Sequence, residues 1–138
     1  MSERLHVRVV KSLPGFSLEV EWSAGEGTAV LFGPSGSGKT LTLQCLAGLV
    51  RPDRGRIVVN GRTLFDADAG VHLPPQARRL GYVFQGYALF PHLTVAANVG
   101  FGLKHLGRAE RESRVAEVID RLGLPDFAGR YPRELSGG

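Results

Sequence analysis

The feature that most constrains the fold is an eight-residue segment, Gly33-Pro34-Ser35-Gly36-Ser37-Gly38-Lys39-Thr40. It fits the pattern G-x-x-x-x-G-K-[ST], and it lies between a short apolar run, Thr28–Phe32, and a helix-favouring stretch that begins at Lys39. Glycines let the backbone form a concave nest whose N–H groups converge on phosphate oxygens, and the following helix N-terminus adds partial positive charge. The segment therefore predicts a phosphate-binding loop between a buried strand and a helix.

Two side chains of this segment carry specific expectations. Lys39 is expected to neutralise the β and γ phosphates of a nucleotide, and the Thr40 hydroxyl to ligate Mg²⁺. The competing interpretation is a glycine-rich turn that binds nothing. Composition alone produces such a match in about one chain in a hundred of this length, and the strand-to-helix context makes chance rarer still.

Composition sets broad limits. The chain has 138 residues, 43% of them hydrophobic and 22% charged, which is typical of one soluble globular domain. Neither a signal peptide nor an apolar run of about 18 residues is present, so we expect a cytoplasmic protein. The net charge of +4 comes mostly from scattered arginines, which argues against a dedicated nucleic-acid surface. The single cysteine, Cys45, has no internal disulfide partner and is expected to be buried.

The first half of the chain reads as strands, loops and one helix. Alternating polarity predicts strands at 5–9 and 16–22, joined by a turn at Pro14-Gly15. Continuous apolar runs predict buried strands at 28–32 and 80–84, with a further strand at 56–60. The predicted helix from Lys39 to Leu49 is ended by Gly48 and Pro52. The polar segment 66–76 is expected to be an exposed loop.

The second half reads as helical. Thr94 is expected to cap a helix that runs towards Leu106 and ends at Gly107. A second helix is predicted from about Ala109 to Gly123, with ion pairs Glu110–Arg114 and Glu117–Arg121. Its apolar stripe, expected to face a core, consists of Val115, Val118, Ile119 and Leu122.

Three further features narrow the family. Gln85 directly follows the apolar run Tyr82-Val83-Phe84, the segment 86–95 comes next, and the chain closes with Leu135-Ser136-Gly137-Gly138. With the phosphate loop, these stand in the order and spacing of the glutamine loop and the start of the LSGGQ signature. Over nearly its whole length the chain therefore resembles the ATPase subunit of an ATP-binding cassette (ABC) transporter of the importer type.

The resemblance implies an α/β phosphate-loop NTPase fold, with a RecA-like core, an antiparallel β subdomain and the start of a helical subdomain. It implies one incomplete ABC domain over residues 1–138, divided into a nucleotide-binding core at 1–90 and a helical part at 91–138. The implied cofactors are ATP and Mg²⁺. The implied activity is ATP hydrolysis coupled to transport, and the implied location is the inner face of the cell membrane.

Residue roles follow by similarity. Gln85 is expected to touch the Mg²⁺ and the attacking water, in a loop that moves against transmembrane permease subunits. Ser136, Gly137 and Gly138 are expected to contact the γ-phosphate of ATP held by a second copy in a head-to-tail homodimer. Phe16, or failing it Trp22, is the candidate for stacking on adenine; an aromatic on an alternating strand can equally be core.

The chain departs from the family pattern in one respect. It stops before the glutamine that finishes the signature and before any apolar strand ending in Asp-Glu. No catalytic carboxylate, Mg²⁺-holding aspartate or switch histidine is therefore assigned. We expect ATP binding with little turnover, an isolated chain that is unstable or aggregates, and an incomplete gene or record; the gene sequence beyond codon 138 tests the last point.

The transported solute is suggested by likeness alone. The run from Leu73 to Gln85 is most similar to importers of molybdate, sulfate and related oxyanions, although spermidine, iron and phosphonate importers have similar segments after the glutamine loop. Two other classes stay open. A non-transport ABC ATPase acting on nucleic acid predicts salt-sensitive DNA binding. A phosphate-loop kinase of small metabolites needs an acceptor site and a lid.

Overall fold

Apolar and polar residues alternate near the N-terminus, and they pair as a hairpin in the computed structural model, which describes residues 4–135. Strand β1 (Leu5–Leu13) runs antiparallel to β2 (Phe16–Ala24), with Leu13 opposite Phe16 across the turn. The alternation places Val7, Val9 and Leu18 on one face, where each is at most 2% exposed. The predicted hairpin is confirmed.

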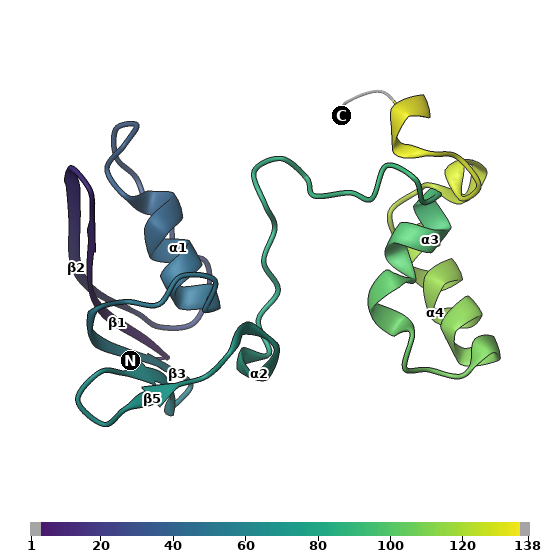
Figure 1. Cartoon of the computed structure of the whole chain (residues 1–138). Coiled ribbons are helices and arrows are strands. Elements are labelled where there is room, and N and C mark those ends of the chain that lie inside the picture. The colour runs from purple at the N-terminus through teal and green to yellow at the C-terminus, as the bar shows by residue number, and fades with distance from the viewer. Residues whose placement is uncertain (1–3, 136–138) are drawn as a thin grey trace. The chain divides into compact units, whose positions relative to one another are not determined.

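Three more strands extend this sheet. Strand β3 (Arg54–Val59) pairs with β1, followed by β4 (Arg62–Asp66) and β5 (Val71–His72). The order is β2-β1-β3-β4-β5, and every pairing is antiparallel (Figure 1). The exposed loop predicted over 66–76 is therefore wrong in part, because β5 lies within it and the short helix α2 (Pro75–Arg78) begins in it. A polar segment can pair its backbone at a sheet edge without burying its side chains.

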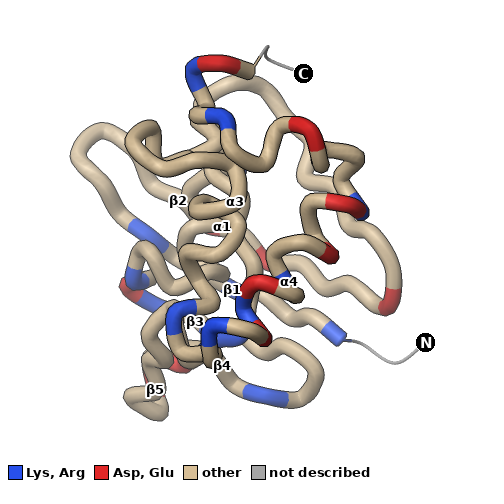
Figure 2. Tube along the Cα trace, turned by 90° about the vertical axis from the view of Figure 1, so that its right-hand side faces the viewer, with Lys and Arg blue, Asp and Glu red and all other residues tan. Residues whose placement is uncertain are grey.

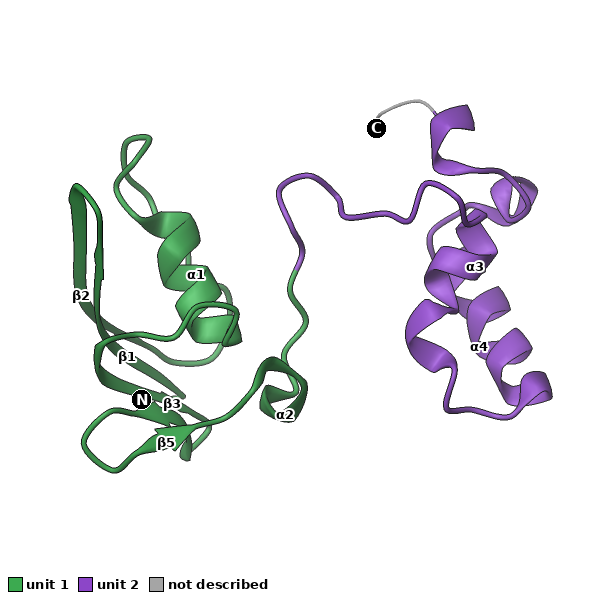
Figure 3. Cartoon of the chain, viewed as in Figure 1, with its two compact units in different colours: residues 1–82 green, residues 83–138 purple. Residues whose placement is uncertain are grey.

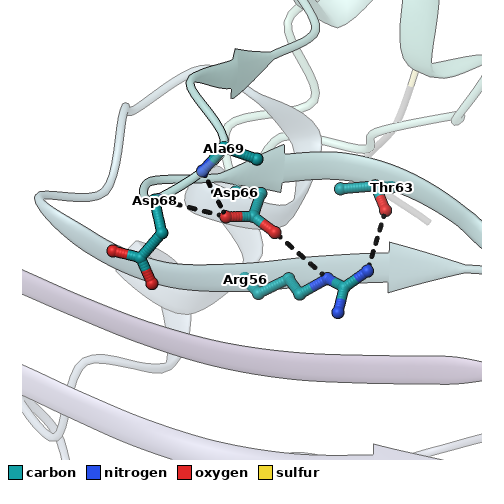
Figure 4. Close-up of polar contacts among 5 residues, drawn as sticks. All are labelled: Arg56, Thr63, Asp66, Asp68 and Ala69. Atoms are coloured by element: carbon teal, nitrogen blue, oxygen red, sulfur yellow. Dashed lines mark hydrogen bonds and ion pairs between the residues drawn. The ribbon is translucent and has the colours of Figure 1, made fainter.

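Polar contacts fix the turn between β4 and β5. Asp66 Oδ1 accepts hydrogen bonds from the backbone N–H groups of Asp68, at 3.1 Å, and Ala69, at 2.9 Å. Its other oxygen lies 3.3 Å from Arg56 Nε, and Arg56 also reaches Thr63 (Figure 4). One carboxylate thus closes the turn and joins β4 to β3.

Helix α1 (Lys39–Ala47) covers the inner face of this sheet (Figure 1). It ends at Gly48, as predicted, and the φ of Gly48 is 82°, which is left-handed. The core between helix and sheet consists of Val7, Val9, Leu18, Cys45, Ile57, Leu64 and Phe65. Burial of each large apolar side chain stabilises the fold by roughly 1.5–3 kcal/mol.

Two predicted strands do not form. Residues 28–32 and 80–84 have no strand structure, and Val30, Phe32 and Val83 are 79%, 99% and 89% exposed. The prediction of buried strands there is wrong for a physical reason. A strand needs a neighbour for its N–H and C=O groups, and no strand within residues 4–135 pairs with either run.

The chain divides into two compact units, residues 1–82 and residues 83–138 (Figure 3). The elements of the second unit are α3 (Val95–Val99), η1 (Phe101–Leu103), α4 (Arg108–Arg121), η2 (Pro125–Phe127) and η3 (Pro132–Glu134). Thr94 caps α3 as predicted, since its Oγ1 accepts a hydrogen bond from the Ala97 N–H at 3.2 Å. The helix predicted to run towards Leu106 instead ends at Gly100 and continues as a 3-10 turn.

Helix α4 confirms the second predicted helix but only part of its details. Ile119 is buried, whereas Val118 is 38% and Leu122 62% exposed, so the apolar stripe is only partly covered. Arg121 pairs with Glu117 at 3.4 Å as expected, while Arg114 also approaches Glu117 and not Glu110. Lys and Arg are spread over both units and not gathered in one block (Figure 2). Within the described part of the chain, every helix is too short or too polar to cross a bilayer.

Candidate nucleotide-binding site

The loop of residues 33–38 leads directly into α1, and Lys39 is the first residue of that helix. Its side chain folds back over the loop: Lys39 Nζ donates to the carbonyl oxygens of Gly33, at 2.8 Å, and Pro34, at 2.6 Å. Ser37 Oγ lies 3.4 Å from the same nitrogen. The ammonium group therefore occupies the concave side of the loop.

Gly38, the last loop glycine, lies flat against β2. Its φ is 90°, and a Cβ atom added there would fall 2.6 Å from Leu18 Cδ1 and 3.2 Å from Phe16 Cζ. A side chain at this position would force the Leu18 and Phe16 side chains of β2 to shift. The signal for Gly38 was in the motif, whereas the supporting role of Leu18 was missed, because strand periodicity marks it only as core.

The start of α1 offers backbone donors. Thr42 N donates to Gly38 O at 2.8 Å, which is the first bond of the helix. By helix geometry the three preceding N–H groups, of Lys39, Thr40 and Leu41, have no intrahelical acceptor. No acidic side chain lies in this first turn. Together with the helix dipole, these donors favour an anion at the loop.

The two threonines of α1 have different environments. Thr42 is 3% exposed and donates its hydroxyl to Gly38 O at 2.9 Å. Thr40 is exposed beside the loop. Among residues 4–135, no cluster of three or more His, Cys, Asp or Glu side chains could hold a metal ion unaided. The donor set fits Mg²⁺ only as a shared ligand sphere of the Thr40 hydroxyl, phosphate oxygens and water.

The two aromatic candidates also differ. The Phe16 ring is 37% exposed and borders Gly38 of the loop. Trp22 is half-buried, packs against the sheet core, and its Nε1 is buried with no hydrogen-bond partner in the described structure. Of the two, Phe16 is the one that lies at the loop with an accessible ring.

Gln85 belongs to the second unit, in an exposed turn where Tyr87 N donates to Phe84 O at 3.1 Å. Tyr87 and Ala88, which follow, both have positive φ values, of 60° and 49°. Ser136, Gly137 and Gly138 lie outside the described residues. The structure thus brings Phe16 together with residues 33–40 in the first unit and places Gln85 in the second.

Sequence reasoning missed one buried charge near α1. Arg78 is 3% exposed and contacts the C-terminal end of this helix. The sequence held no signal for it, because an arginine in a polar, proline-rich segment reads as a solvated side chain.

A family model described as ABC transporter matches residues 17–138. The chain belongs to the ABC transporter family. This membership confirms the resemblance drawn from the phosphate loop, the glutamine loop and the signature, and the importer-type relatives below agree with it.

Among curated relatives, the molybdenum import ATP-binding protein ModC of Paramagnetospirillum magneticum is 53% identical over 89% of this ABC chain and 34% of its own length. ModC of Rhodospirillum rubrum is 46% identical, covering 97% of this chain and 36% of its own. The molybdate/tungstate import ATP-binding protein WtpC of Archaeoglobus fulgidus is 43% identical over 97% of this chain and 53% of its own. The chain thus spans about a third of the ModC relatives and about half of WtpC.

Solved structures agree. The dimeric structure of MJ0796, a bacterial ABC transporter cassette, matches with a TM-score of 0.75 and 28% identity, over 96% of this chain and 63% of that one. The post-hydrolysis state of MJ0796 bound to ADP and Pi matches with a TM-score of 0.74. The expected α/β cassette fold is thereby confirmed. The ADP and Pi bound to the second MJ0796 structure show that this relative binds nucleotide.

Proposed function

We propose that this ABC chain is the nucleotide-binding part of an importer's ATP-binding subunit and that it binds Mg-ATP at residues 33–40. The observation that carries the proposal is the Lys39 ammonium, held over the loop by two carbonyl oxygens at the N-terminus of α1. A cation, the backbone N–H donors at the start of α1 and a glycine packed against β2 together form a cradle for a polyphosphate.

In this proposal Lys39 exchanges its loop carbonyls for the β and γ phosphate oxygens. Thr40 ligates Mg²⁺, whose positive charge offsets the negative charge of the phosphates. Gln85 orients the attacking water, and Phe16 stacks on adenine beside Gly38. Support for Phe16 comes from its partial exposure and its contact with the loop.

The proposed partners are transmembrane permease subunits and a second copy of the chain, arranged head to tail. Ser136, Gly137 and Gly138 would then contact the γ-phosphate bound by that second copy. The dimeric MJ0796 cassette and the import function named for the relatives support this assembly. It would place the protein on the cytoplasmic side of the cell membrane, attached through the permease.

We propose molybdate, or a tetrahedral oxyanion like it, as the imported solute. Its support is the ModC and WtpC relatives, at 43% to 53% identity. The dispersed arginines give no observation in favour of a nucleic-acid role.

The nucleotide test is calorimetric titration of the full-length natural protein with Mg-ATP. Lys39→Ala is expected to abolish measurable binding while thermal unfolding stays close to that of the wild type. Lys104→Ala, which removes an exposed lysine of the second unit, serves as the matched control and should bind normally. Unchanged affinity in Lys39→Ala would refute the site.

The solute test uses the full-length protein assembled with its permease in lipid vesicles. ATP-dependent uptake of molybdate is expected, with tungstate as a competitor and a divalent cation such as Fe²⁺ as the negative control. Uptake of the cation without molybdate uptake would reject the oxyanion proposal and leave the nucleotide site untouched.

A further inference from the structure

Arg78 is a buried cation that the proposed chemistry does not use. Its side chain is 3% exposed, and no ion pair joins it to a carboxylate within residues 4–135. Burial lowers the pKa of Arg78 from its usual range, since the charged form loses hydration. Buried charges are normally compensated, so its surroundings must supply the compensation.

Backbone carbonyls supply it. Nε donates to Leu73 O at 2.8 Å, while Nη1 donates to Cys45 O at 2.9 Å and to Leu46 O at 2.8 Å. Cys45 and Leu46 belong to the last turn of α1, where helix geometry leaves carbonyls in need of donors, and Cys45 O also accepts from Gly48 N at 3.2 Å. The guanidinium therefore caps the negative end of the helix dipole.

Gly48 makes room for this contact. A Cβ atom at position 48 would fall 2.5 Å from Arg78 Nε and 2.8 Å from its Cζ. The same glycine ends α1 in a left-handed conformation, with its N–H bonded to Cys45 O. The helix end and the guanidinium thus fit together only with glycine at this position.

Arg78 also lies where α1 meets the chain that leads to the second unit. It is the last residue of α2, and Leu73, whose carbonyl it holds, is tied to β4 through the bond from Leu73 N to Leu64 O. Through one side chain, the C-terminal end of α1 is fastened to the sheet edge. The N-terminal end of the same nine-residue helix forms the phosphate loop.

We propose that Arg78 is a positioning residue for the nucleotide site, which fixes the axis of α1 by its C-terminal carbonyls and so sets the phosphate loop at the other end. The inference rests on the proposed nucleotide function. A helix of nine residues is about 14 Å long. If its axis tilts about the C-terminal end, the phosphate loop at the N-terminal end is displaced. Phosphate recognition by converging N–H groups is sensitive to such displacements.

A planar guanidinium suits the role better than an ammonium. Arg78 spans three carbonyls from two segments with two of its nitrogens, whereas lysine would place one compact charge among them. Its Nη2 is buried with no partner in the described structure. An unpaired buried donor destabilises the folded state, and the three bonds to backbone carbonyls must offset this cost.

Positioning can be separated from simple stabilisation by measuring binding where the variant is folded. Arg78→Met removes the donor shared by three backbone carbonyls, so we expect its thermal midpoint to fall. At a temperature well below that midpoint, where the variant is fully folded, we expect it to bind Mg-ATP about tenfold more weakly than the wild type. The affinity of Arg78→Lys should fall between those of the wild type and Arg78→Met, because lysine keeps a charge at the helix end but lacks the planar donor geometry of the guanidinium.

The experiment measures three quantities on the full-length natural protein: the Kd for Mg-ATP by calorimetry, the thermal midpoint, and amide hydrogen exchange by mass spectrometry. Exchange should become faster in peptides covering residues 33–42 of Arg78→Met, with peptides from the 5–24 hairpin unchanged. Arg51→Met is the matched control, because Arg51 is exposed and makes no ion pair or hydrogen bond in the described structure. Gly48→Ala is a second variant that displaces the guanidinium without removing it, and it should weaken binding in the same direction.

The outcomes are distinct. Wild-type affinity in Arg78→Met, measured while the variant is folded, overturns the inference. So does an equal rise in exchange across the whole first unit, since that reports general destabilisation. If Lys39→Ala binds Mg-ATP normally, the proposed function fails; the exchange of residues 33–42 in Arg78→Met still reports whether Arg78 positions the loop.

Discussion

Single residues decide how the phosphate loop is shaped. Gly38 has a left-handed backbone and faces Leu18 and Phe16 of β2, so conformation and space both disfavour a side chain there. Gly36 has a similar φ of 80°, but a Cβ atom there would meet nothing within 4 Å. Substitutions at Gly36 and Gly38 therefore distinguish the cost of backbone strain from the cost of a steric clash.

We predict that Gly38→Ala weakens Mg-ATP binding by more than about tenfold and lowers thermal stability, since strain and the clash with Leu18 act together. Gly36→Ala should cost only the strain, roughly 1 kcal/mol of the free energy of unfolding. Calorimetric affinity and urea unfolding measure both. Equal losses in the two variants would contradict the contact with β2.

Cys45 supplies a second prediction at this scale. Burial in the core raises the pKa of its thiol from 9.0 to about 11. The folded state therefore keeps the proton that the unfolded state loses first, so this contribution is complete below pH 9 and is lost as the pH rises towards 11. Two pKa units correspond to about 2–3 kcal/mol at most.

Urea unfolding at pH 8 and pH 10.5 tests this contribution. The wild type should lose more stability between the two pH values than Cys45→Ala, which lacks the titrating group and carries its cavity cost at both. Lysines and tyrosines also titrate in this range, and the comparison cancels them. Equal losses in the two proteins would show that the thiol does not titrate with a raised pKa.

At the scale of elements, the Asn98 side chain holds the segment that precedes α3 against this helix. Asn98 Nδ2 donates to the carbonyls of Phe90, Leu93 and Thr94, and its Oδ1 accepts from Phe90 N at 2.9 Å. These bonds fold the segment that follows Gln85 back onto the helix. The segment contains little other regular structure.

We predict that Asn98→Ala destabilises the second unit by about 1–3 kcal/mol, because several backbone groups lose their partner together. Amide exchange in peptides covering residues 86–95 should become faster. Ser113→Ala, on the exposed side of α4, is the control and should change neither quantity. Unchanged exchange over 86–95 would show that the segment is held by other contacts.

Element prediction from sequence succeeded where the signal is local. The β1–β2 hairpin, α1 with Gly48, the Thr94 cap and α4 all follow from periodicity and capping residues. The runs 28–32 and 80–84 failed, because apolar character predicts burial but says nothing about a pairing partner. The phosphate loop was predictable for the same reason, because its motif is one continuous segment. The burial of Arg78 was not, because it depends on three carbonyls up to 33 residues away.

At the scale of the whole molecule, exposed apolar side chains are concentrated in unpaired segments. Phe32 is 99% exposed and Val30 79%, which is unusual for residues flanked by apolar neighbours. Exposed strand-like segments with free backbone groups favour association between chains. The 138-residue chain by itself should therefore aggregate as its concentration rises.

We predict that Phe32→Ser reduces this aggregation, measured by light scattering over a concentration series. Leu13→Ser, at the tip of the hairpin, is the control; Leu13 is also exposed, at 44%, but its strand is already paired. Equal improvement in both variants would attribute aggregation to general hydrophobicity and not to the unpaired segment.

The all-antiparallel sheet has a consequence for how the chain folds during synthesis. All five strands lie between Leu5 and His72, and three of the four pairings join strands that are consecutive in the chain. Such local contacts form early, and translation delivers only about 5–20 residues per second. The sheet and its covering helix can thus be complete while later residues are still inside the ribosome, so the phosphate loop gains its rigid support before the unpaired run 80–84 and the second unit emerge.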